Sequence, residues 1–185
     1  MLRSLTVAVL SLVAATSVWA QGRREEPWPE LKKLDYFVGD WFEEGEVKAG
    51  PLGAGGKVTM HDQREWMDGN FFIIIHSKFT ALKSEGTGVA FMGYDPNAKA
   101  YTYDEFYSQG EADHCRGRFE GDQWIWNMND MKMGGQMVKA RYTVKIVSPT
   151  FYTYKFETSN DGGQTWTLFM DGTGRKEPKE ASSSR

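Results

Sequence analysis

The sequence contains little cysteine and little histidine, and it has no excess of positive charge. Of its 185 residues one is cysteine, Cys115, so no disulfide can form within the chain and burial must stabilise the fold. Lys and Arg total 22 against 25 Asp and Glu, which gives a formal net charge of −3. A mildly acidic chain lacks the basic surface that binds nucleic acid, so we expect no nucleic-acid partner.

Long apolar runs are absent after residue 20. Residues 1–20 hold a short positive start, "MLR", the apolar run "SLTVAVLSLVAATSV" and a small-residue cleavage pattern ending at Ala20. This run is shorter than the about 20 apolar residues that a membrane-spanning helix needs. We therefore predict a signal peptide over residues 1–20, no membrane span, and a periplasmic or secreted protein.

A helical pattern occurs at one place in the chain. The charged, proline-containing stretch 21–30 is typical of a linker, and Leu31, Leu34 and Phe37 then stand at helical spacing. The polar stretch 176–185 has no apolar residues large enough to anchor it, so we predict a disordered tail. One short helix and one domain over residues 31–175 follow from this division.

Between these ends the sequence reads as short aromatic and β-branched runs separated by turn residues. No segment of crossover length interrupts the runs, which excludes a parallel sheet. A long antiparallel meander removes its edges by closing, so we predict an all-β, up-and-down barrel of about ten strands. The expected strands lie near residues 40–48, 57–67, 70–81, 87–94, 99–107, 110–119, 122–130, 136–147, 150–158 and 164–175.

The stretch "SNDGGQTW" fits the Asp-box pattern S-x-D-x-G-x-T-W of sialidase propellers. A propeller needs repeated blades, and the chain has neither a second box nor the length for them. The pattern also describes a hairpin, in which Asp161 accepts hydrogen bonds from amides of its own turn and Trp166 packs over the bend. We therefore interpret Asp161 and Trp166 as turn residues.

The stretch "LDYFVGDWFEEGEV" places Gly39 and Trp41 between the short helix and the first strand. This resembles the G-x-W signature of lipocalins and other calycins. In those barrels the Trp closes one end beneath an Arg from the last strand, a role for which Arg175 is the matching residue. A planar cation stacked on an indole is also a favourable plug on physical grounds.

The order of five motifs extends this resemblance over residues 31–175. "LDYFVGDWFEEGEV", "GPLGAGG", "REWMDGNFFI", "GYDPNAKAYT" and "SNDGGQTWT" follow one another as in the domain of unknown function 1579 family. That family is grouped with exported bacterial proteins that have lipocalin-like barrels. The resemblance implies a fold and no established activity.

Cofactor and metal sites have little support in the sequence. "GPLGAGGK" lacks the spacing of a phosphate-binding loop. Nitrobindin-like barrels hold haem through a late His, whereas His61, His76 and His114 all precede the final strands. Haem is therefore disfavoured unless His76 or His114 points inward. His114 and Cys115 face opposite sides of a strand, which argues against a metal site in "EADHC".

Charged residues in phase with apolar ones are the main functional signal. Arg64 shares its strand face with Trp66, Glu105 is in phase with Tyr103, and Arg116 is in phase with His114. An internal ion-pair network or an outward face would explain them, and so would a cavity in which Arg fixes a ligand carboxylate. The candidate ligand-binding residues are Arg64, Trp66, Tyr103, Glu105, His114, Arg116, Trp126 and Tyr154.

Three functions remain open from the sequence. The first is a non-catalytic, exported binding protein, a monomer or homodimer, for a small amphipathic or anionic hydrophobic ligand. The second is an isomerase- or hydrolase-like enzyme that uses Glu105 with His114 or Arg116 in the same cavity. The third is a filled barrel that serves as an envelope scaffold or dimer module, with Phe72 and Ile74 exposed.

Overall fold

The computed structural model describes residues 26–51, 53–82 and 84–178. Within them a 3₁₀ helix precedes eleven strands. The predicted signal peptide, the start of the predicted linker and residues 179–185 of the predicted tail lie outside the described residues. The elements are η1 (Pro29–Phe37), β1 (Gly39–Val47), β2 (Gly56–Trp66), β3 (Ile73–Ala81), β4 (Ser84–Asp95), β5 (Ala100–Tyr107), β6 (Ala112–Glu120), β7 (Gln123–Met128), β8 (Met131–Met133), β9 (Gln136–Ser148), β10 (Phe151–Ser159) and β11 (Thr167–Lys176).

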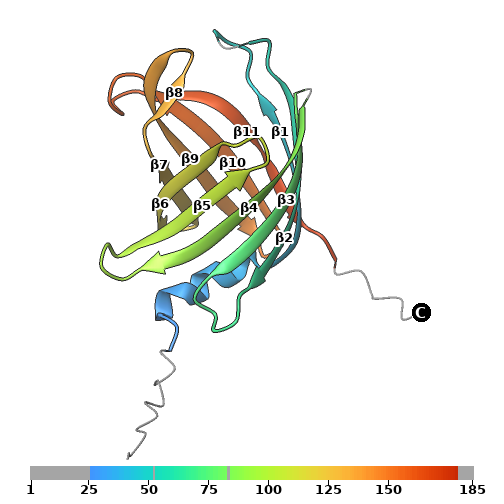
Figure 1. The fold of residues 1–185 in the computed structure, drawn as a ribbon, viewed down its shortest axis with the longest axis vertical. Helices are drawn as coiled ribbons and strands as arrows, with labels where there is room; N and C mark the ends of the chain where they lie inside the picture. Colours follow the sequence, from blue (N-terminus) through green and yellow to red (C-terminus); the bar gives the residue numbers. More distant parts are fainter. Residues whose placement is uncertain (1–25, 52, 83, 179–185) are drawn as a thin grey trace, which may run out of the picture.

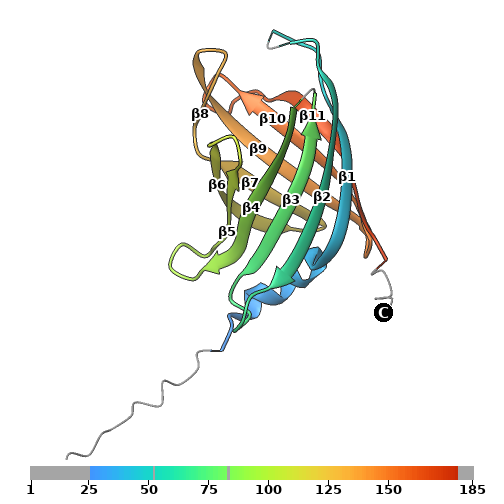
Figure 2. The same ribbon diagram turned by 45° about the vertical axis from the view of Figure 1, so that its right-hand side comes forward.

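The strands form a closed antiparallel barrel (Figures 1 and 2). The hydrogen-bonded order is β10-β11-β1-β2-β3-β4-β5-β6-β7-β9, and β9 pairs back onto β10 to complete the circle. Within the described residues ten strands make the barrel, and the short β8 pairs with β9 beyond the end of β7. The predicted all-β barrel of about ten strands with one short helix is confirmed.

Alternation of side chains along each strand explains the closed sheet. In β9, Ala140 and Val144 are buried in the barrel, whereas Lys139 and Lys145 lie on its outer surface. Residues with such a period of two present one face to the core and one to solvent. The outer surface is not uniformly polar, because Phe72, the residue before β3, is 46% exposed.

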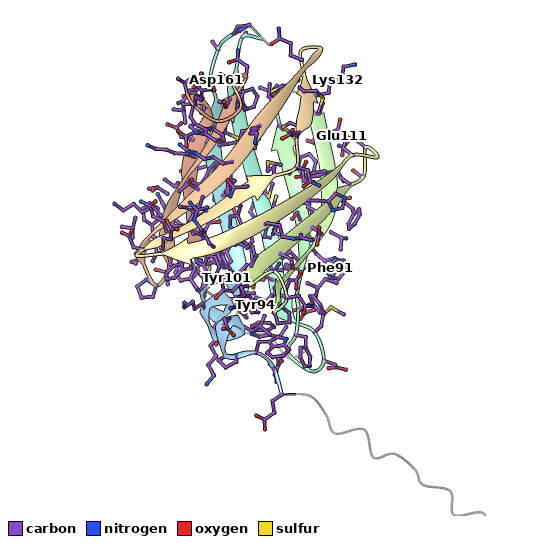
Figure 3. All side chains as sticks on the ribbon, turned by 90° about the vertical axis from the view of Figure 1, so that its left-hand side faces the viewer. Phe91, Tyr94, Tyr101, Glu111, Lys132 and Asp161 are labelled. Atoms are coloured by element: carbon purple, nitrogen blue, oxygen red, sulfur yellow. The ribbon has the colours of Figure 1, made fainter. Side chains whose placement is uncertain are left out.

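Helix η1 lies at one end of the barrel, here called the closed end, and away from the opposite end, here called the open end (Figures 1 and 3). Helix η1 lies across the closed end, where β1, β3 and β5 begin. The turns that follow β1, β3, β5, β8 and β10 lie at the opposite, open end. Figure 3 shows this polarity, with Asp161, Lys132 and Glu111 at the open end and Tyr101 and Tyr94 near the helix.

Helix η1 plugs the closed end with three buried apolar residues, Leu31, Leu34 and Phe37. Hydrogen bonds to the strands fix its position. Tyr101 donates its hydroxyl to the carbonyl of Glu30 at 2.9 Å, and Trp66 donates its indole N–H to a carboxylate oxygen of Asp35 at 2.8 Å. The helix begins at Pro29, so the last two residues of the predicted linker belong to it.

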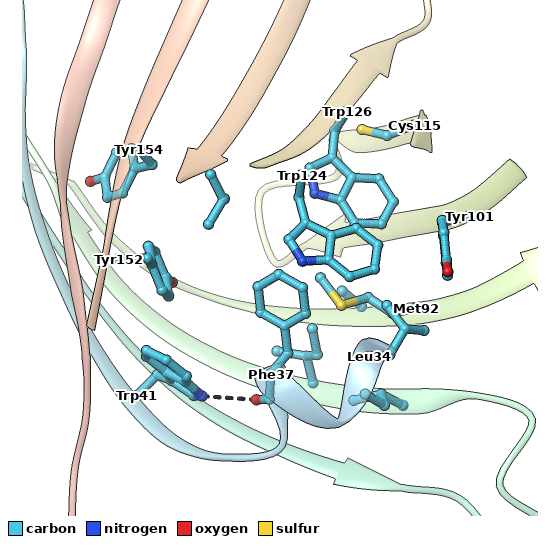
Figure 4. Close-up of a cluster of buried hydrophobic side chains, with 14 of the residues drawn as sticks. Leu34, Phe37, Trp41, Met92, Tyr101, Cys115, Trp124, Trp126, Tyr152 and Tyr154 are labelled. Atoms are coloured by element: carbon cyan, nitrogen blue, oxygen red, sulfur yellow. Dashed lines mark hydrogen bonds between the residues drawn. The ribbon is translucent and has the colours of Figure 1, made fainter. Parts of the chain in front are cut away.

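Trp41 is the centre of this plug (Figure 4). It is 1% exposed and donates its indole N–H to the carbonyl of Phe37 at 2.8 Å. The centroid of its ring lies 4.9 Å from the ring centroid of Tyr152 and 5.5 Å from that of Tyr36. Gly39, two residues earlier, has a φ of 120°, which other residues adopt only with strain. Gly39 and Trp41 therefore occupy the positions that the G-x-W resemblance implies.

Two cations lie over the ring of Trp41, Lys176 and Arg64, and the predicted pairing with Arg175 is wrong. Trp41 stands opposite Lys176 in the β1–β11 ladder, and the Lys176 ammonium lies 5.1 Å from the indole centroid. It also donates a hydrogen bond to the carbonyl of Tyr36 at 3.1 Å. Arg175 points outward, over the ring of Phe151. The strand runs one residue further than predicted, so Lys176 belongs to the barrel and not to the tail.

The Asp-box segment forms a hairpin turn at the open end. Asp161 Oδ1 accepts backbone N–H groups of Gln164 and Thr165 at 3.0 and 2.9 Å, and Oδ2 accepts the Thr165 hydroxyl at 2.6 Å. These hydrogen bonds from Thr165 lower the pKa of Asp161. The guanidinium of Arg141 lies 4.2 Å from the ring centroid of Trp166. Asp161 and Trp166 therefore stabilise the turn, as the sequence predicts.

Replacing Trp41 with alanine should destabilise the barrel strongly. Loss of a fully buried indole leaves a cavity and should lower the free energy of unfolding by about 3–5 kcal/mol. Trp28 is the matched control, because it is 41% exposed before the helix, and Trp28→Ala should stay within about 1 kcal/mol of the unsubstituted protein. Denaturant unfolding of both variants makes the comparison, and equal effects would contradict the plug.

Candidate functional site

A cavity of about 210 Å³ lies inside the barrel. This is far more than the roughly 10–15 Å³ that a single buried water needs. Buried rings pack near η1, where the ring centroids of Trp124 and Trp126 lie 5.6 Å apart in a stacked pair (Figure 4), and of these two residues Trp126 lines the cavity. The wall is predominantly apolar, and its apolar members include Val58, Met60, Met92, Trp126, Met128, Val144, Phe156 and Met170.

The cavity is closed by η1 at one end and is bordered by half-buried residues at the other. Phe37 of η1 forms its floor and is 1% exposed. Lining residues near the open end, such as Val58, Met128 and Met170, are only half-buried. A small molecule would therefore enter through the end opposite η1.

A buried ion-pair network lies at the floor of the cavity. Arg64 donates to Asp62 Oδ2 from Nε and Nη2, at 3.0 and 2.6 Å. Arg64 Nη2 also forms an ion pair with Glu43 and donates to the Tyr152 hydroxyl at 3.2 Å. Tyr152 in turn donates its hydroxyl to Glu43. The network joins β1, β2 and β10.

The Arg64 guanidinium is already neutralised by the chain itself. Arg64, Glu43 and Asp62 are 6%, 7% and 4% exposed, respectively. Burial raises the pKa of Glu43, and the Arg64 charge opposes that rise. The sequence left open an internal Arg–Glu or Arg–Tyr network, and the structure has such a network. Arg64 therefore has no free charge with which to fix a ligand carboxylate.

A second polar cluster lies on β5 and β6, nearer the open end. Glu105 Oε2 accepts the hydroxyls of Tyr103 and Tyr107, at 2.6 and 2.9 Å. The Tyr107 hydroxyl also lies 3.1 Å from Asp113 Oδ2. A phenol has one proton, so Tyr107 can donate to Glu105 or to Asp113 but not to both. One of the two carboxyl groups must therefore lack this donor or carry a proton itself.

The pKa values follow from this arrangement. Burial raises the pKa of Glu105 to about 7, against the lowering effect of the two tyrosine hydrogen bonds. The negative charges of Asp62 and Asp113 act in the same direction as burial. Burial also raises the pKa of Asp113. The carboxyl groups of this cluster thus lack a compensating cation, in contrast to those beside Arg64.

Five of the predicted ligand-binding residues line the cavity. They share the inner face of their strands. Trp126 and Tyr154 are each 3% exposed, and their rings form part of the aromatic wall in Figure 4. The structure gathers these residues from β2, β5, β7 and β10. The five are Arg64, Tyr103, Glu105, Trp126 and Tyr154.

The other three predicted residues do not reach the cavity. Trp66 lies at the closed end, bound to Asp35 of η1. His114 and Arg116 are on the outside of β6, where the His114 ring lies 2.8 Å from Asp104. The inner face of β6 instead carries Cys115 and the residues two positions before and after it, Asp113 and Gly117. The predicted pairing of Glu105 with His114 or Arg116 is wrong for this reason.

The orientation of the histidines also bears on cofactors. His61, His76 and His114 are all exposed on the outer surface. None of them is placed to ligate a haem or a metal in the cavity. Among the residues that the structure describes, no group of three or more His, Cys, Asp or Glu side chains could hold a metal ion. Burial raises the pKa of Cys115 to about 12, so its thiol is a poor nucleophile.

Several lining residues were missed by the sequence interpretation. Asp62 is in phase with Arg64, and Glu43 is in phase with Trp41, so strand alternation contained a signal for both. Asp113 was missed because the opposite face of β6 was taken as the inner one. The cross-strand partners themselves could not be read from the sequence.

Comparisons with known proteins agree with this architecture. A family model described as "Protein of unknown function (DUF1579)" matches residues 26–176. The chain belongs to the DUF1579 family. No curated protein matches it. In the described part of this DUF1579 protein, no helix is long and apolar enough to cross a membrane.

Solved structures of other proteins share the barrel. Rv2717c from M. tuberculosis matches with a TM-score of 0.58 and 11% sequence identity, over 83% of this chain and 100% of that chain. The S-type phycobiliprotein lyase CPES from Guillardia theta matches with a TM-score of 0.56 and 7% identity, over 80% of this chain and 93% of that chain. These likenesses establish a lipocalin-like, calycin-type fold and carry no activity across.

Replacing Arg64 should destabilise the DUF1579 protein severely. Arg64→Met leaves Glu43 and Asp62 buried without their cation and should lower the free energy of unfolding by about 3–5 kcal/mol. The matched control is Arg118→Met, since the Arg118–Glu120 pair is exposed and such pairs contribute about 0–1 kcal/mol. Urea unfolding at neutral pH measures both, and similar losses would contradict the network.

The raised pKa of Glu105 predicts a pH-dependent stability. The folded protein holds this proton more tightly than the unfolded chain, so the contribution is fully present below about pH 4.5. It is lost as pH rises through about 7. Between these limits the unfolding free energy should fall by about 3 kcal/mol more in the unsubstituted protein than in Glu105→Gln.

Urea unfolding of the two proteins at a series of pH values measures this difference. The control is Glu65→Gln, because Glu65 is exposed on the outside of β2 and should leave the pH profile unchanged. Parallel profiles for Glu105→Gln and the unsubstituted protein would contradict the raised pKa.

Proposed function

We propose that this DUF1579 protein is a non-catalytic binding protein that holds a small, largely apolar molecule inside its barrel. The cavity of about 210 Å³ within the calycin-type fold is the observation that carries the proposal. Concave, mainly apolar sites with a few placed polar groups are typical of small-molecule binding. A filled barrel acting only as a scaffold would have no need for such a space.

The arrangement of the polar groups favours binding over catalysis. The predicted acid–base pair is split between the inside and the outside of the barrel, because Glu105 points inward while His114 and Arg116 do not. The remaining polar groups are distributed around the wall. They are suited to orienting a ligand through hydrogen bonds.

We further propose that the protein acts outside the cytoplasm. The basis is the signal-peptide pattern of residues 1–20, which the sequence carries independently of the barrel. N-terminal sequencing of the protein isolated from cell fractions tests this point. A cytoplasmic protein that retains residues 1–20 would contradict it.

The first test of binding is native mass spectrometry of the protein purified from its natural host. A bound small molecule that is released on unfolding is the expected result. Isothermal titration with small aromatic alcohols, which match the apolar wall, gives a second measure. A protein that is always ligand-free and binds no such molecule would contradict the proposal.

Filling the cavity should abolish binding without unfolding the barrel. Met128 lines the half-buried, open end of the cavity, so Met128→Trp should weaken ligand binding by at least about tenfold through steric exclusion. The matched control is Met137→Trp, because Met137 is 61% exposed and does not line the cavity. Equal affinities for both variants would place the ligand elsewhere.

A further inference from the structure

A row of residues crosses four neighbouring strands, and the two residues at its ends, Asp62 and Glu105, line the cavity. Asp62 on β2 stands directly opposite Ser77 on β3, and Ser77 stands opposite Gly88 on β4. A Cβ atom built on Gly88 would lie 3.1 Å from Glu105 Oε1. The carboxylate of β5 therefore occupies the space that a side chain at residue 88 would take. Asp62, Ser77, Gly88 and Glu105 together form what we call the acidic notch.

The acidic notch presents hydrogen-bonding atoms that the protein itself does not satisfy. Asp62 Oδ1, Ser77 Oγ and Glu105 Oε1 are buried and have no hydrogen-bond partner among the described residues. The three side chains are 4%, 3% and 4% exposed, respectively. Buried polar atoms normally have partners, so the unpaired oxygens of Asp62 and Glu105, which both line the cavity, indicate a place where another molecule binds.

The charge of the wall shows what kind of molecule this is. Among the described residues that line the cavity, four are carboxylic acids and one, Arg64, is a cation. Arg64 is occupied by Glu43 and by Asp62 Oδ2. Glu105 accepts its two hydrogen bonds at Oε2 alone. Asp62 and Glu105 therefore line the cavity, each with one carboxylate oxygen that has no partner among the described residues, and no free cation of the lining balances them.

We propose that the cavity binds an organic ammonium ion, with its positively charged head in the acidic notch and its apolar body along the aromatic wall. The head would pair with the carboxylate of Glu105, with the charge of Asp62 beside it. This inference rests on the proposed binding function and specifies the ligand class. Of the amphipathic or anionic ligand that the sequence suggested, it keeps the amphipathic character and gives the polar head a positive charge.

The rest of the cavity fits the remainder of such a molecule. Trp126, Met60 and Met92 line it with apolar surface. An indole face also attracts an ammonium ion that has left water. A neutral ligand would leave the negative charge of the notch unbalanced, and a carboxylate would add to it. The ammonium head is thus the chemistry that the notch recognises best.

Isothermal titration with three probes that share one aromatic body tests this selectivity at about pH 8, where Glu105 is ionised. The probes are naphthylmethylamine, naphthylmethanol and naphthylacetate, together with the corresponding phenyl series. The affinity for the amine should be at least about tenfold higher than that for the alcohol, as expected for a hydrogen bond to a charged group. The carboxylate should bind most weakly.

Two variants assign the selectivity to the notch. Glu105→Gln should reduce the preference for the amine to about twofold or less while the affinity for the alcohol persists, which also shows that the cavity has folded. Gly88→Ala is the second variant, because its methyl group would crowd Glu105 Oε1 without removing any charge. It too should lower the preference for the amine. Glu65→Gln, on the outer surface, is the matched control and should leave the preference intact.

The outcomes separate this inference from the proposed function. Binding of the alcohol as tightly as the amine, or tighter binding of the carboxylate, would overturn the ammonium proposal and leave the binding function standing. An amine preference that survives Glu105→Gln would also overturn it. Failure of every probe in both series to bind would overturn the binding function itself.

Discussion

The guanidinium of Arg64 lies where the plug of the barrel meets the cavity, and both depend on it. Its carbon is 5.4 Å from the ring centroid of Trp41 and 5.7 Å from that of Phe37, so it packs on the plug from the cavity side. Its nitrogens bind Glu43 and Asp62. A buried charge without these partners would be costly, so the position of Arg64 constrains β1, β2 and η1 together. The same network separates the tightly packed end of the barrel from its open space.

Aromatic packing at the closed end offsets the loss of stability that the cavity towards the open end causes. Rings there lie directly on glycine backbone, as Tyr152 does on Gly174 and Trp126 does on Gly117. A Cβ at either glycine would collide with the ring. This close approach concentrates large buried surfaces near η1, where each contributes most to stability. The half-buried methionines near the open end can then border a cavity without unfolding the barrel.

The fold could be predicted from the sequence, because alternation and turn residues are local signals that the barrel obeys. The inward direction of Arg64 and Glu105 followed from the same alternation. β6 was assigned to the wrong face because its inner residues, Cys115 and Gly117, are small where Trp126 needs room. Lys176 was missed because the last strand was predicted to end at residue 175, so its final, inward-facing residue was assigned to the tail. The partners of Arg64 and the unsatisfied row from Asp62 to Glu105 arise across strands, and no sequence pattern contains them.

The two acidic sites of the cavity therefore differ in a way that stability alone does not explain. Glu43 lies beside a cation, and its burial is compensated by Arg64 and Tyr152. Glu105 is as deeply buried, but the charges acting on it are those of Asp62 and Asp113, which raise its pKa further. An ionised Glu105 destabilises the folded barrel at neutral pH, and a neutral side chain of similar size would remove that loss. Destabilising charges inside a cavity are a mark of functional sites. The physical role that fits Glu105 is contact with a molecule that brings the missing positive charge.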